Sequence, residues 1–243
     1  MARKIERSAK KRPVQLMLTC EHGGNRIPRE YAHLFRGAKS AVQSHRGWDP
    51  GALDLAHALG RSFGLPVHEV TWCRLLVESN RAPTNPRIWS EFSADLPAAD
   101  KTEILERYWW PHRRAVEAAI ARNLKAGRRV LHVAVHSFTP VMSGVRRNAD
   151  IGLLYDSRRA TEKVLCERWQ SLLEAEDDAV RVRRNYPYIG ATDGFPTWLR
   201  RRHGPKDYAG IELEVNQALF AARPLKAIHR LIARTLEQLL DAA

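Results

Sequence analysis

Two histidines and one glutamate lie toward the ends of three apolar segments of the chain. The segment VQLMLTCEH ends at His22, the segment RVLHVAVHSF contains His136 near its end, and the segment GIELEVNQ contains Glu214. If these segments are strands of one sheet, the three side chains converge at the rim where α/β sheets bind ligands. Histidines and a carboxylate, with one position open for water, are the protein ligands of a catalytic zinc. The pattern therefore predicts a metal-dependent site.

A second carboxylate lies on the same segment as Glu214. Glu212 and Glu214 are two residues apart, so in a strand both side chains point to the same face. Burying two unpaired acids costs several kcal/mol, and each therefore needs an arginine, a metal or a proton. We expect Glu214, which is nearer the end of the strand, to take part in the chemistry.

Three other polar residues could belong to the same site: Asp49, His132 and His45. Asp49, in HRGWDPGA, is either the N-cap of the following helix, with Pro50 at its first position, or a metal ligand at the same rim. His132 lies roughly 13 Å deeper along its strand than His136, and we expect it to be a hydrogen-bonded core residue. His45 is a further candidate for the site.

Arginines near the expected rim are candidates for substrate binding. Asn80 and Arg81 lie together in the turn-rich stretch ESNRAPTNP, and Arg146 and Arg147 follow His136 closely. The forked donors of arginine match the two oxygens of a carboxylate. The alternative is that these arginines are surface charges of a basic protein.

Strand and helix patterns alternate along the chain. Strands are expected at 14–22, 129–138, 150–156 and 208–219, with one or two extended segments in 65–78. Helices are expected at 49–64, at 100–129 with a possible break at Pro111, at 159–176 and at 224–243, and 186–205 is expected to be a long functional loop. This alternation predicts an α/β fold with a mixed or mostly parallel sheet covered on both faces.

Length and composition favour one globular unit. The chain has 243 residues, of which 44% are hydrophobic, and single α/β domains commonly reach about 250 residues. We expect a basic disordered tail over residues 1–13 and a single domain over 14–243. No apolar run reaches the about 18 residues of a membrane span, and no apolar segment follows the basic start as in a secretory signal. We therefore expect a cytoplasmic protein without a membrane partner.

The three cysteines raise a second catalytic hypothesis. Cys20, Cys73 and Cys166 are odd in number and form no CxxC pair, which favours a reducing compartment over a disulfide framework. Cys20 lies two residues before His22, so it can share a face with that histidine. A cysteine-dependent hydrolase therefore remains an alternative, although a buried core cysteine is the simpler interpretation.

The charge of the chain allows two kinds of anionic partner. The formal net charge is +13, which favours either nucleic acid or a small anionic substrate. The sequence has no zinc finger, basic zipper or RNP-like aromatic signature. We therefore do not expect a nucleic-acid partner, and a non-catalytic nucleic-acid-binding protein remains the other alternative.

Seven short motifs, taken together, resemble one enzyme family. They occur in the order EHGGNRIP, HRGWDPGA, ESNRAPTNP, HSFTP, DIGLLYD, NYPYIGATDG and GIELEVNQ. This set resembles the N-formylglutamate amidohydrolase (N-formylglutamate deformylase) family, over about Leu18 to Leu219. The resemblance implies a three-layer α/β/α sandwich with a mixed, mostly parallel central sheet, similar to zinc carboxypeptidases and the phosphorylase/hydrolase-like fold.

The resemblance implies a role for each metal-site residue. His22 and His136 match the two histidine ligands, and Glu214 matches the catalytic glutamate. The related carboxypeptidases use His-x-x-Glu, but Asn25 stands three residues after His22. Asp49 is then the first candidate for the third ligand, and Glu21 is the second.

The same resemblance implies the reaction and the substrate class. Asn80 and Arg81 match the pair that holds a substrate carboxylate, Arg81 also aiding catalysis, and Arg146, Arg147 and Thr192 are further candidates for substrate binding. The expected enzyme is a zinc-dependent (or other divalent-metal) amidohydrolase. It would cleave N-formyl or other small N-acyl amino acids, such as N-formylglutamate, into an amino acid and a carboxylate. The loop YPYIGATDG departs from the pattern of the histidine-degradation enzymes, so the wider substrate class is the safer expectation.

Overall fold

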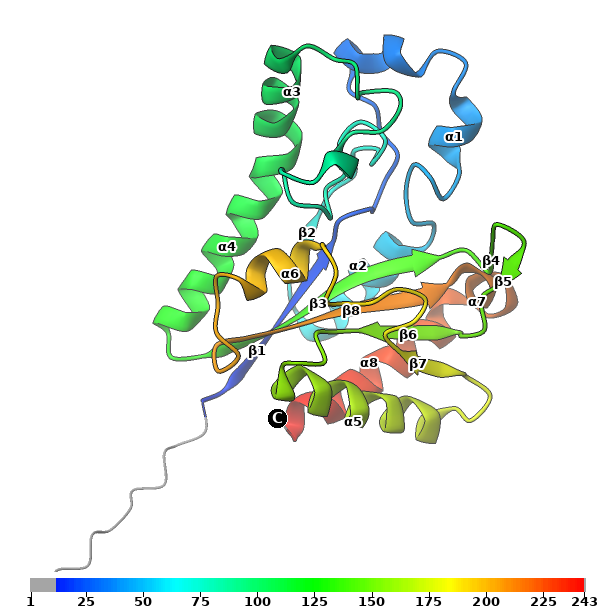
Figure 1. Cartoon of the computed structure of the whole chain (residues 1–243). Coiled ribbons are helices and arrows are strands. Elements are labelled where there is room, and N and C mark those ends of the chain that lie inside the picture. Colours follow the sequence, from blue (N-terminus) through cyan, green and yellow to red (C-terminus); the bar gives the residue numbers. More distant parts are fainter. Residues whose placement is uncertain (1–11, 243) are drawn as a thin grey trace, which may run out of the picture.

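A computed structural model describes residues 12–242 of the protein. A twisted sheet of six strands forms its centre, with helices around it (Figure 1). The strand order is β2-β1-β3-β8-β6-β7. Their bounds are β1 (Val14–Cys20), β2 (Val67–Glu69), β3 (Arg129–Phe138), β6 (Ile151–Leu154), β7 (Val182–Arg184) and β8 (Tyr208–Asn216). All neighbours are parallel except β6 and β8, which are antiparallel. The sheet is thus mixed and mostly parallel, as the sequence predicts.

Helices cover both faces of this sheet. Their bounds are α1 (Lys39–Gln43), α2 (Ala52–Phe63), α3 (Ala98–Ile104), α4 (Trp110–Lys125), α5 (Ala160–Glu176), α6 (Phe195–Arg200), α7 (Gln217–Ala222) and α8 (Leu225–Asp241), and a hairpin joins β4 (Val141–Met142) to β5 (Val145–Arg146). Apolar residues of α2, α5 and α8 form one core with the sheet. Residues of α4 and α6 form a smaller core on its opposite face. The expected α/β/α layering is confirmed (Figure 1).

The alternation of side chains along β3 separates the main core from the polar face. Leu131, Val133 and Val135 join the core with α2, α5 and α8. Since successive side chains of a strand point to opposite faces, His132 and His136 lie on the face covered by α4 and α6. β1 and β8 alternate in the same way, so their polar residues share that face.

Several expected elements have different bounds in the structure. Helix α2 begins at Ala52 instead of Asp49, because Gly51, with φ 82°, turns the chain before the helix starts. The last strand ends at Asn216, whose side chain accepts a hydrogen bond from Ala218 and caps α7. The helix expected at 100–129 begins earlier and contains a π-helical turn, Leu105–Trp109, before Pro111. The expected loop at 186–205 contains α6.

A second apolar cluster lies beside the sheet. It joins the 3-10 helix Arg29–Phe35 and the turns around residues 72–92 to α3 and the start of α4. Cys73 is part of this cluster. The extended segments expected in 65–78 reduce to β2 and an isolated bridge between Arg26 and Trp72.

The tail expected at 1–13 lies largely outside the described residues, which begin at Arg12. Arg12 donates hydrogen bonds to Asp207 and to the carbonyl of Gly127, and the carbonyl of Pro13 accepts one from Arg129. These two residues therefore contact the domain. Within residues 12–242, every helix is too short or too polar to span a membrane.

His132 is a buried structural histidine, as expected from the sequence. Its side chain is fully buried, with Thr19 Oγ1 and the Tyr208 hydroxyl each 2.7 Å from a ring nitrogen. Burial lowers the pKa of His132 from 6.5 to about 3. The folded chain therefore holds His132 neutral at mildly acidic pH, while the unfolded chain protonates it.

This difference predicts an acid-sensitive stability. Between pH 6.5 and 3 the unfolded state binds a proton that the folded state does not. The free energy of unfolding therefore decreases as the pH is lowered, by about 3 kcal/mol at pH 4. Urea unfolding of His132→Gln from pH 7 to pH 4 should show a shallower decline than the native chain. The exposed His33→Gln should keep the native slope. Equal slopes for all three proteins would contradict the assignment.

Candidate active site

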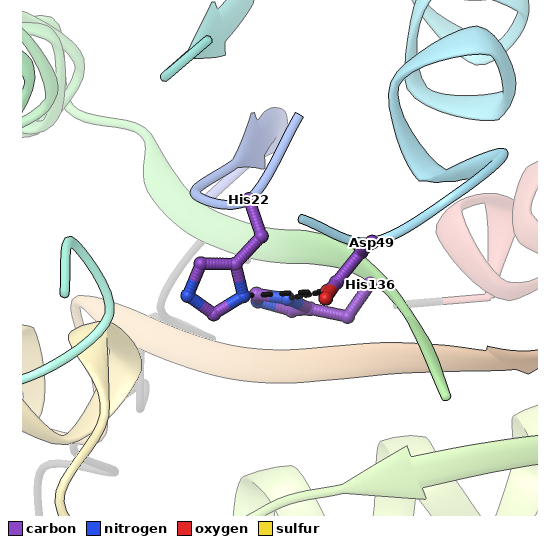
Figure 2. A group of neighbouring side chains, drawn as sticks. All are labelled: His22, Asp49 and His136. Atoms are coloured by element: carbon purple, nitrogen blue, oxygen red, sulfur yellow. Dashed lines mark hydrogen bonds and ion pairs between the residues drawn. The ribbon is translucent and has the colours of Figure 1, made fainter. Parts of the chain in front are cut away.

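Two histidines converge on one carboxylate oxygen at the carboxyl ends of β1 and β3 (Figure 2). Asp49 Oδ2 lies 2.9 Å from His136 Nδ1 and 3.3 Å from His22 Nδ1. The two imidazole rings are 5.0 Å apart between centroids and meet edge to face. All three side chains are buried. The structure thus brings together the three residues that the sequence analysis assigns to a metal.

The chain after β1 explains the glycines beside His22. A Cβ on Gly24 would lie 2.6 Å from the carbonyl oxygen of Thr71, so only glycine lets the two segments approach this closely. The amide of Gly23 donates to the carbonyl of Val70. These contacts fix the turn that directs His22 over the end of the sheet.

The loop before α2 carries Asp49 to the histidines. Its backbone amide donates to the carbonyl of His22, and the Ser137 hydroxyl donates to the carbonyl of Pro50. Helix α2 has no side-chain N-cap, so Asp49 does not cap it. The Asp49 carboxylate is therefore free of a capping role and faces the two histidines.

Each histidine contacts a second carboxylate through its other ring nitrogen. His22 Nε2 is hydrogen-bonded to Glu78, and His136 Nε2 lies 3.2 Å from Glu21 Oε2. This arrangement leaves both Nδ1 atoms facing the shared Asp49 oxygen. Outer carboxylates of this kind fix the orientation and tautomer of metal-binding histidines. Glu21 thus lies behind His136, whereas Asp49 lies in front of both rings.

The charged groups of this cluster stabilise one another in their ionised forms. Burial would raise the pKa of Asp49, but the two histidines lower it well below its usual range. Burial would also lower the pKa of His136, but Asp49 and Glu21 raise it well above its usual range. Arg74 neutralises part of the negative charge, donating to Glu78 Oε2 at 2.8 Å and to Asp49 Oδ1 at 3.3 Å. The carboxylates therefore stay ionised although they are buried.

The donor set of the cluster fits a divalent metal ion. His22, Asp49 and His136 each offer one ligand atom, and these atoms lie within 4.8 Å of one another. Two imidazole nitrogens and a carboxylate oxygen are a common ligand set for zinc and for several other divalent metals. The three residues can therefore hold a metal with a position left for water.

Glu214 lies next to this cluster on the neighbouring strand. In the parallel pairing of β3 and β8, Glu214 is opposite His136. Its Oε2 is buried and has no hydrogen-bond partner among residues 12–242. Burial raises the pKa of Glu214 to about 7, with His136 opposing and Asp49 adding to the shift. A buried carboxyl group with this pKa is suited to take up and release protons near neutral pH.

Glu212 has a structural partner instead. Its Oε1 accepts a hydrogen bond from Asn80 Nδ2 at 3.1 Å, and Asn80 Oδ1 accepts one from the amide of Phe195 at 2.6 Å. Asn80 therefore ties β8 and the start of α6 to its own turn. The two carboxylates that look alike in sequence thus differ in surroundings, with Glu214 facing the cluster unpaired.

These residues line a cavity of about 220 Å³. The expected residues in its wall are His22, His45, Asp49, Asn80, Arg81, His136, Arg147, Thr192, Glu212 and Glu214. Arg81 donates to the carbonyl of Asp193 at 3.2 Å. Arg147 lies across the cavity mouth and donates to Tyr188. Within residues 12–242, neither arginine forms an ion pair with a carboxylate, so both retain charge for an anionic ligand.

Arg146 is not brought to this cavity. It lies in the exposed strand β5, where its backbone pairs with Val141 and its side chain is exposed. Arg147, the next residue, follows the strand and does line the cavity. A role of Arg146 in substrate binding stays a prediction.

Two site residues carry no assignment from sequence. Glu78 is buried beside His22, and Arg74, which is partly exposed, contacts both Glu78 and Asp49. The signal in the sequence is their opposite charge at a spacing of four residues.

Cys20 lies in the apolar core and is fully buried, which raises its thiol pKa well above the usual value. It is poorly placed to act as a nucleophile.

The fold and the cavity define an α/β protein whose buried site combines two histidines and an aspartate with the unpaired carboxyl group of Glu214. The chain belongs to the N-formylglutamate amidohydrolase family, whose sequence model matches residues 14–221. A gene product from Agrobacterium tumefaciens has a similar crystal structure, with 30% sequence identity and a TM-score of 0.77 over 92% of this chain and 91% of that chain. N-formylglutamate amidohydrolase from Ralstonia eutropha shares the fold, with 19% identity and a TM-score of 0.69 over 96% of this chain and 98% of that chain. A comparison with curated proteins gave no match.

The positions of Asp49 and Glu21 predict different effects on metal affinity. Asp49→Asn should weaken zinc binding more than Glu21→Gln, because Asp49 faces both Nδ1 atoms while Glu21 contacts only the far nitrogen of His136. Loss of an outer carboxylate typically costs about 10–100-fold in affinity. Competition with a fluorescent zinc chelator measures both constants. A larger loss for Glu21→Gln would make Glu21 the third ligand.

Proposed function

We propose that this protein is a metal-dependent amidohydrolase that removes a small N-acyl group, such as formyl, from an N-acyl amino acid such as N-formylglutamate. One observation carries this proposal: His22, Asp49 and His136 converge beside the buried, unpaired Glu214. Membership of the N-formylglutamate amidohydrolase family supports the reaction type. The two arginines of the cavity without ion-pair partners support an anionic substrate.

The chain's own residues supply the proton transfers of this reaction. A bound zinc ion would polarise the amide carbonyl and lower the pKa of water to about 7. Glu214 takes a proton from the attacking water and passes it to the nitrogen of the leaving amine. The C–O bond to the acyl carbon forms and the C–N bond breaks. One amide and one water thus give a carboxylate and a free amino acid.

Arg81 is proposed to bind the substrate carboxylate and to aid catalysis. Its guanidinium lines the cavity, and only the carbonyl of Asp193 accepts from it among residues 12–242. A charge-assisted pair between this group and the α-carboxylate would orient the amide over Glu214. Asn80 supports the same turn, while Arg147 and Thr192 contact the rest of the substrate.

Loss of this pair predicts a selective defect. Arg81→Ala should lower kcat/KM for an N-formyl amino acid by about 10–100-fold, the loss expected for a hydrogen bond to a charged group. The corresponding amino-acid amide, which lacks the carboxylate, should be nearly unaffected by the same substitution. Steady-state kinetics on both substrates measures the contrast. Equal losses on both would show that Arg81 does not bind the carboxylate.

Metal content and a substrate screen test the proposed function together. Mass spectrometry of the purified protein should find near-stoichiometric divalent metal, and the expected metal is zinc. The same preparation is then assayed with N-formyl and N-acetyl amino acids, with and without a chelator. Activity that chelation removes and zinc restores supports the proposal. No metal after incubation with zinc, or activity that survives chelation, would contradict it.

The cysteine alternative has a distinct signature. A thiol alkylator should inactivate a Cys20-dependent enzyme, whereas the proposed enzyme should tolerate it, because all three cysteines are buried. The nucleic-acid alternative stays untested and predicts retention that weakens steeply with salt. The cytoplasmic location expected from the sequence also stays a prediction.

A further inference from the structure

Exposed apolar side chains gather at the mouth of the cavity. Of the six large hydrophobic side chains that are exposed in residues 12–242, five lie on the hairpin β4–β5 or in the adjacent loop at Tyr188 and Ile189. Met142, Tyr188 and Ile189 line the cavity itself and are 39%, 42% and 59% exposed. We call these three residues the apolar rim. The hairpin projects beyond the carboxyl end of β3 (Figure 1).

Two contacts hold the halves of the apolar rim together. Arg147 Nη2 lies 2.8 Å from Met142 Sδ and donates to the Tyr188 hydroxyl at 2.9 Å, so one guanidinium bridges the hairpin and the loop. The loop is also held against the sheet, because a Cβ on Gly190 would lie 2.2 Å from the amide nitrogen of Tyr155. These contacts therefore fix the positions of the apolar rim, although its side chains are exposed.

The inner wall continues this apolar surface toward the site. Phe138 and Leu154 line the same cavity and are both nearly fully buried, at 2% exposed. Arg147 lies 5.8 Å from the Phe138 ring centroid, measured from its central guanidinium carbon. The cavity thus offers apolar contact from its interior to its mouth, in addition to the polar cluster at its base.

Arg81 and the apolar rim line the same cavity and contact the same loop. Arg81 donates to the carbonyl of Asp193, and Arg147 donates to the hydroxyl of Tyr188 in that loop. In an N-acyl amino acid, the α-carboxylate and the acyl chain lie on opposite sides of the scissile amide. A substrate with its carboxylate on Arg81 would therefore keep its acyl group free to contact the apolar rim.

We infer that Met142, Tyr188 and Ile189 form a subsite for an apolar acyl group, so that the preferred substrates carry an acyl chain longer than formyl. This inference rests on the proposed amidohydrolase function. A formyl group has no carbon chain and would leave the apolar rim in water. Covering exposed apolar surface is favourable, and each methylene that a pocket accommodates can change kcat/KM by about tenfold or more.

Four substrates separate this inference from its alternatives. The zinc-loaded protein is assayed with N-formyl-glutamate, N-hexanoyl-glutamate, N-formyl-leucine and N-hexanoyl-leucine. The expected result is a kcat/KM at least about tenfold higher for each hexanoyl substrate than for its formyl counterpart. A preference for leucine over glutamate, with no effect of acyl length, would place the amino-acid side chain on the apolar rim and overturn the inference. Preference for formyl would overturn it as well.

A substitution on the apolar rim and a matched control complete the test. Ile189→Ser should lower the hexanoyl-to-formyl ratio of kcat/KM by about fivefold or more, by loss of apolar contact. Val164→Ser changes an equally exposed apolar residue on α5, away from the cavity, and should keep the native ratio. An unchanged ratio in Ile189→Ser would overturn the inference while leaving the proposed function intact. Failure to hydrolyse all four substrates would overturn both.

Discussion

Replacing His22 and His136 together by alanine is expected to remove bound metal and to lower kcat/KM by about 10⁴-fold or more. Both Nδ1 atoms face Asp49, so the double substitution deletes two of the three ligand atoms. A metal supplies several kcal/mol of transition-state stabilisation in amide hydrolysis, and each 1.36 kcal/mol is tenfold in rate. Mass spectrometry of the metal and an assay of the same sample measure both effects.

The control for this prediction must separate loss of metal from loss of fold. Removing two buried imidazoles leaves Glu21 and Glu78 without these partners, which destabilises the folded state. Thermal unfolding of the variant therefore accompanies the metal analysis. If the double variant does not fold, His22→Gln, which keeps a polar side chain at that position, replaces it. A folded variant that keeps stoichiometric metal would refute the assigned site.

Glu214→Gln is expected to lower kcat by about 10²–10⁴-fold while the protein retains its metal. The carboxyl oxygen Oε2 is buried and unpaired among the described residues, and it lies on the strand next to His136. Glutamine keeps the size of the side chain but cannot accept the proton of water, so the loss matches that of a general base. Metal content equal to that of the native protein is the control. Native kcat in this variant would exclude Glu214 as the base.

The pH profile adds a second test of Glu214. The base acts in its ionised form, and burial raises its pKa to about 7. Activity should therefore fall by about tenfold per pH unit below that value and level off above it. A bound cation favours the ionised carboxylate and moves this limb to lower pH. The residual activity of Glu214→Gln should lack the limb, and a limb that persists must belong to another group.

The strand-borne part of the site could be predicted from sequence. His136 and Glu214 lie in long apolar runs that read as strands, and within a strand the direction of each side chain follows from its place in the alternation. β3 has the bounds that the sequence predicts. His22 was placed for the same reason, since the apolar run of β1 ends just before it. Local patterning therefore fixes which side chains meet at the rim of the sheet.

The loop-borne part could not be predicted in the same way. The sequence around Asp49 fits both a helix cap and a site residue. The structure excludes the cap, because Gly51 turns the chain and α2 begins only after it. Glu78 lies in turns whose positions depend on contacts with residues far away in sequence, such as its hydrogen bond with His22. The direction of Arg146 depends on the hairpin. Contacts of this kind are set by tertiary structure and leave no periodic signal.

His136 and Glu214 lie on paired strands, whereas loops form the mouth of the cavity, and this difference has a consequence for evolution and design. His136 and Glu214 are opposite each other on paired strands, so backbone hydrogen bonds fix their separation whatever the loops do. The hairpin at 141–146 lies outside this pairing and is largely exposed, so it can change in length and composition more readily than the strands. Exchanging this hairpin between relatives should therefore alter the entrance of the cavity while the pairing of His136 with Glu214 stays intact.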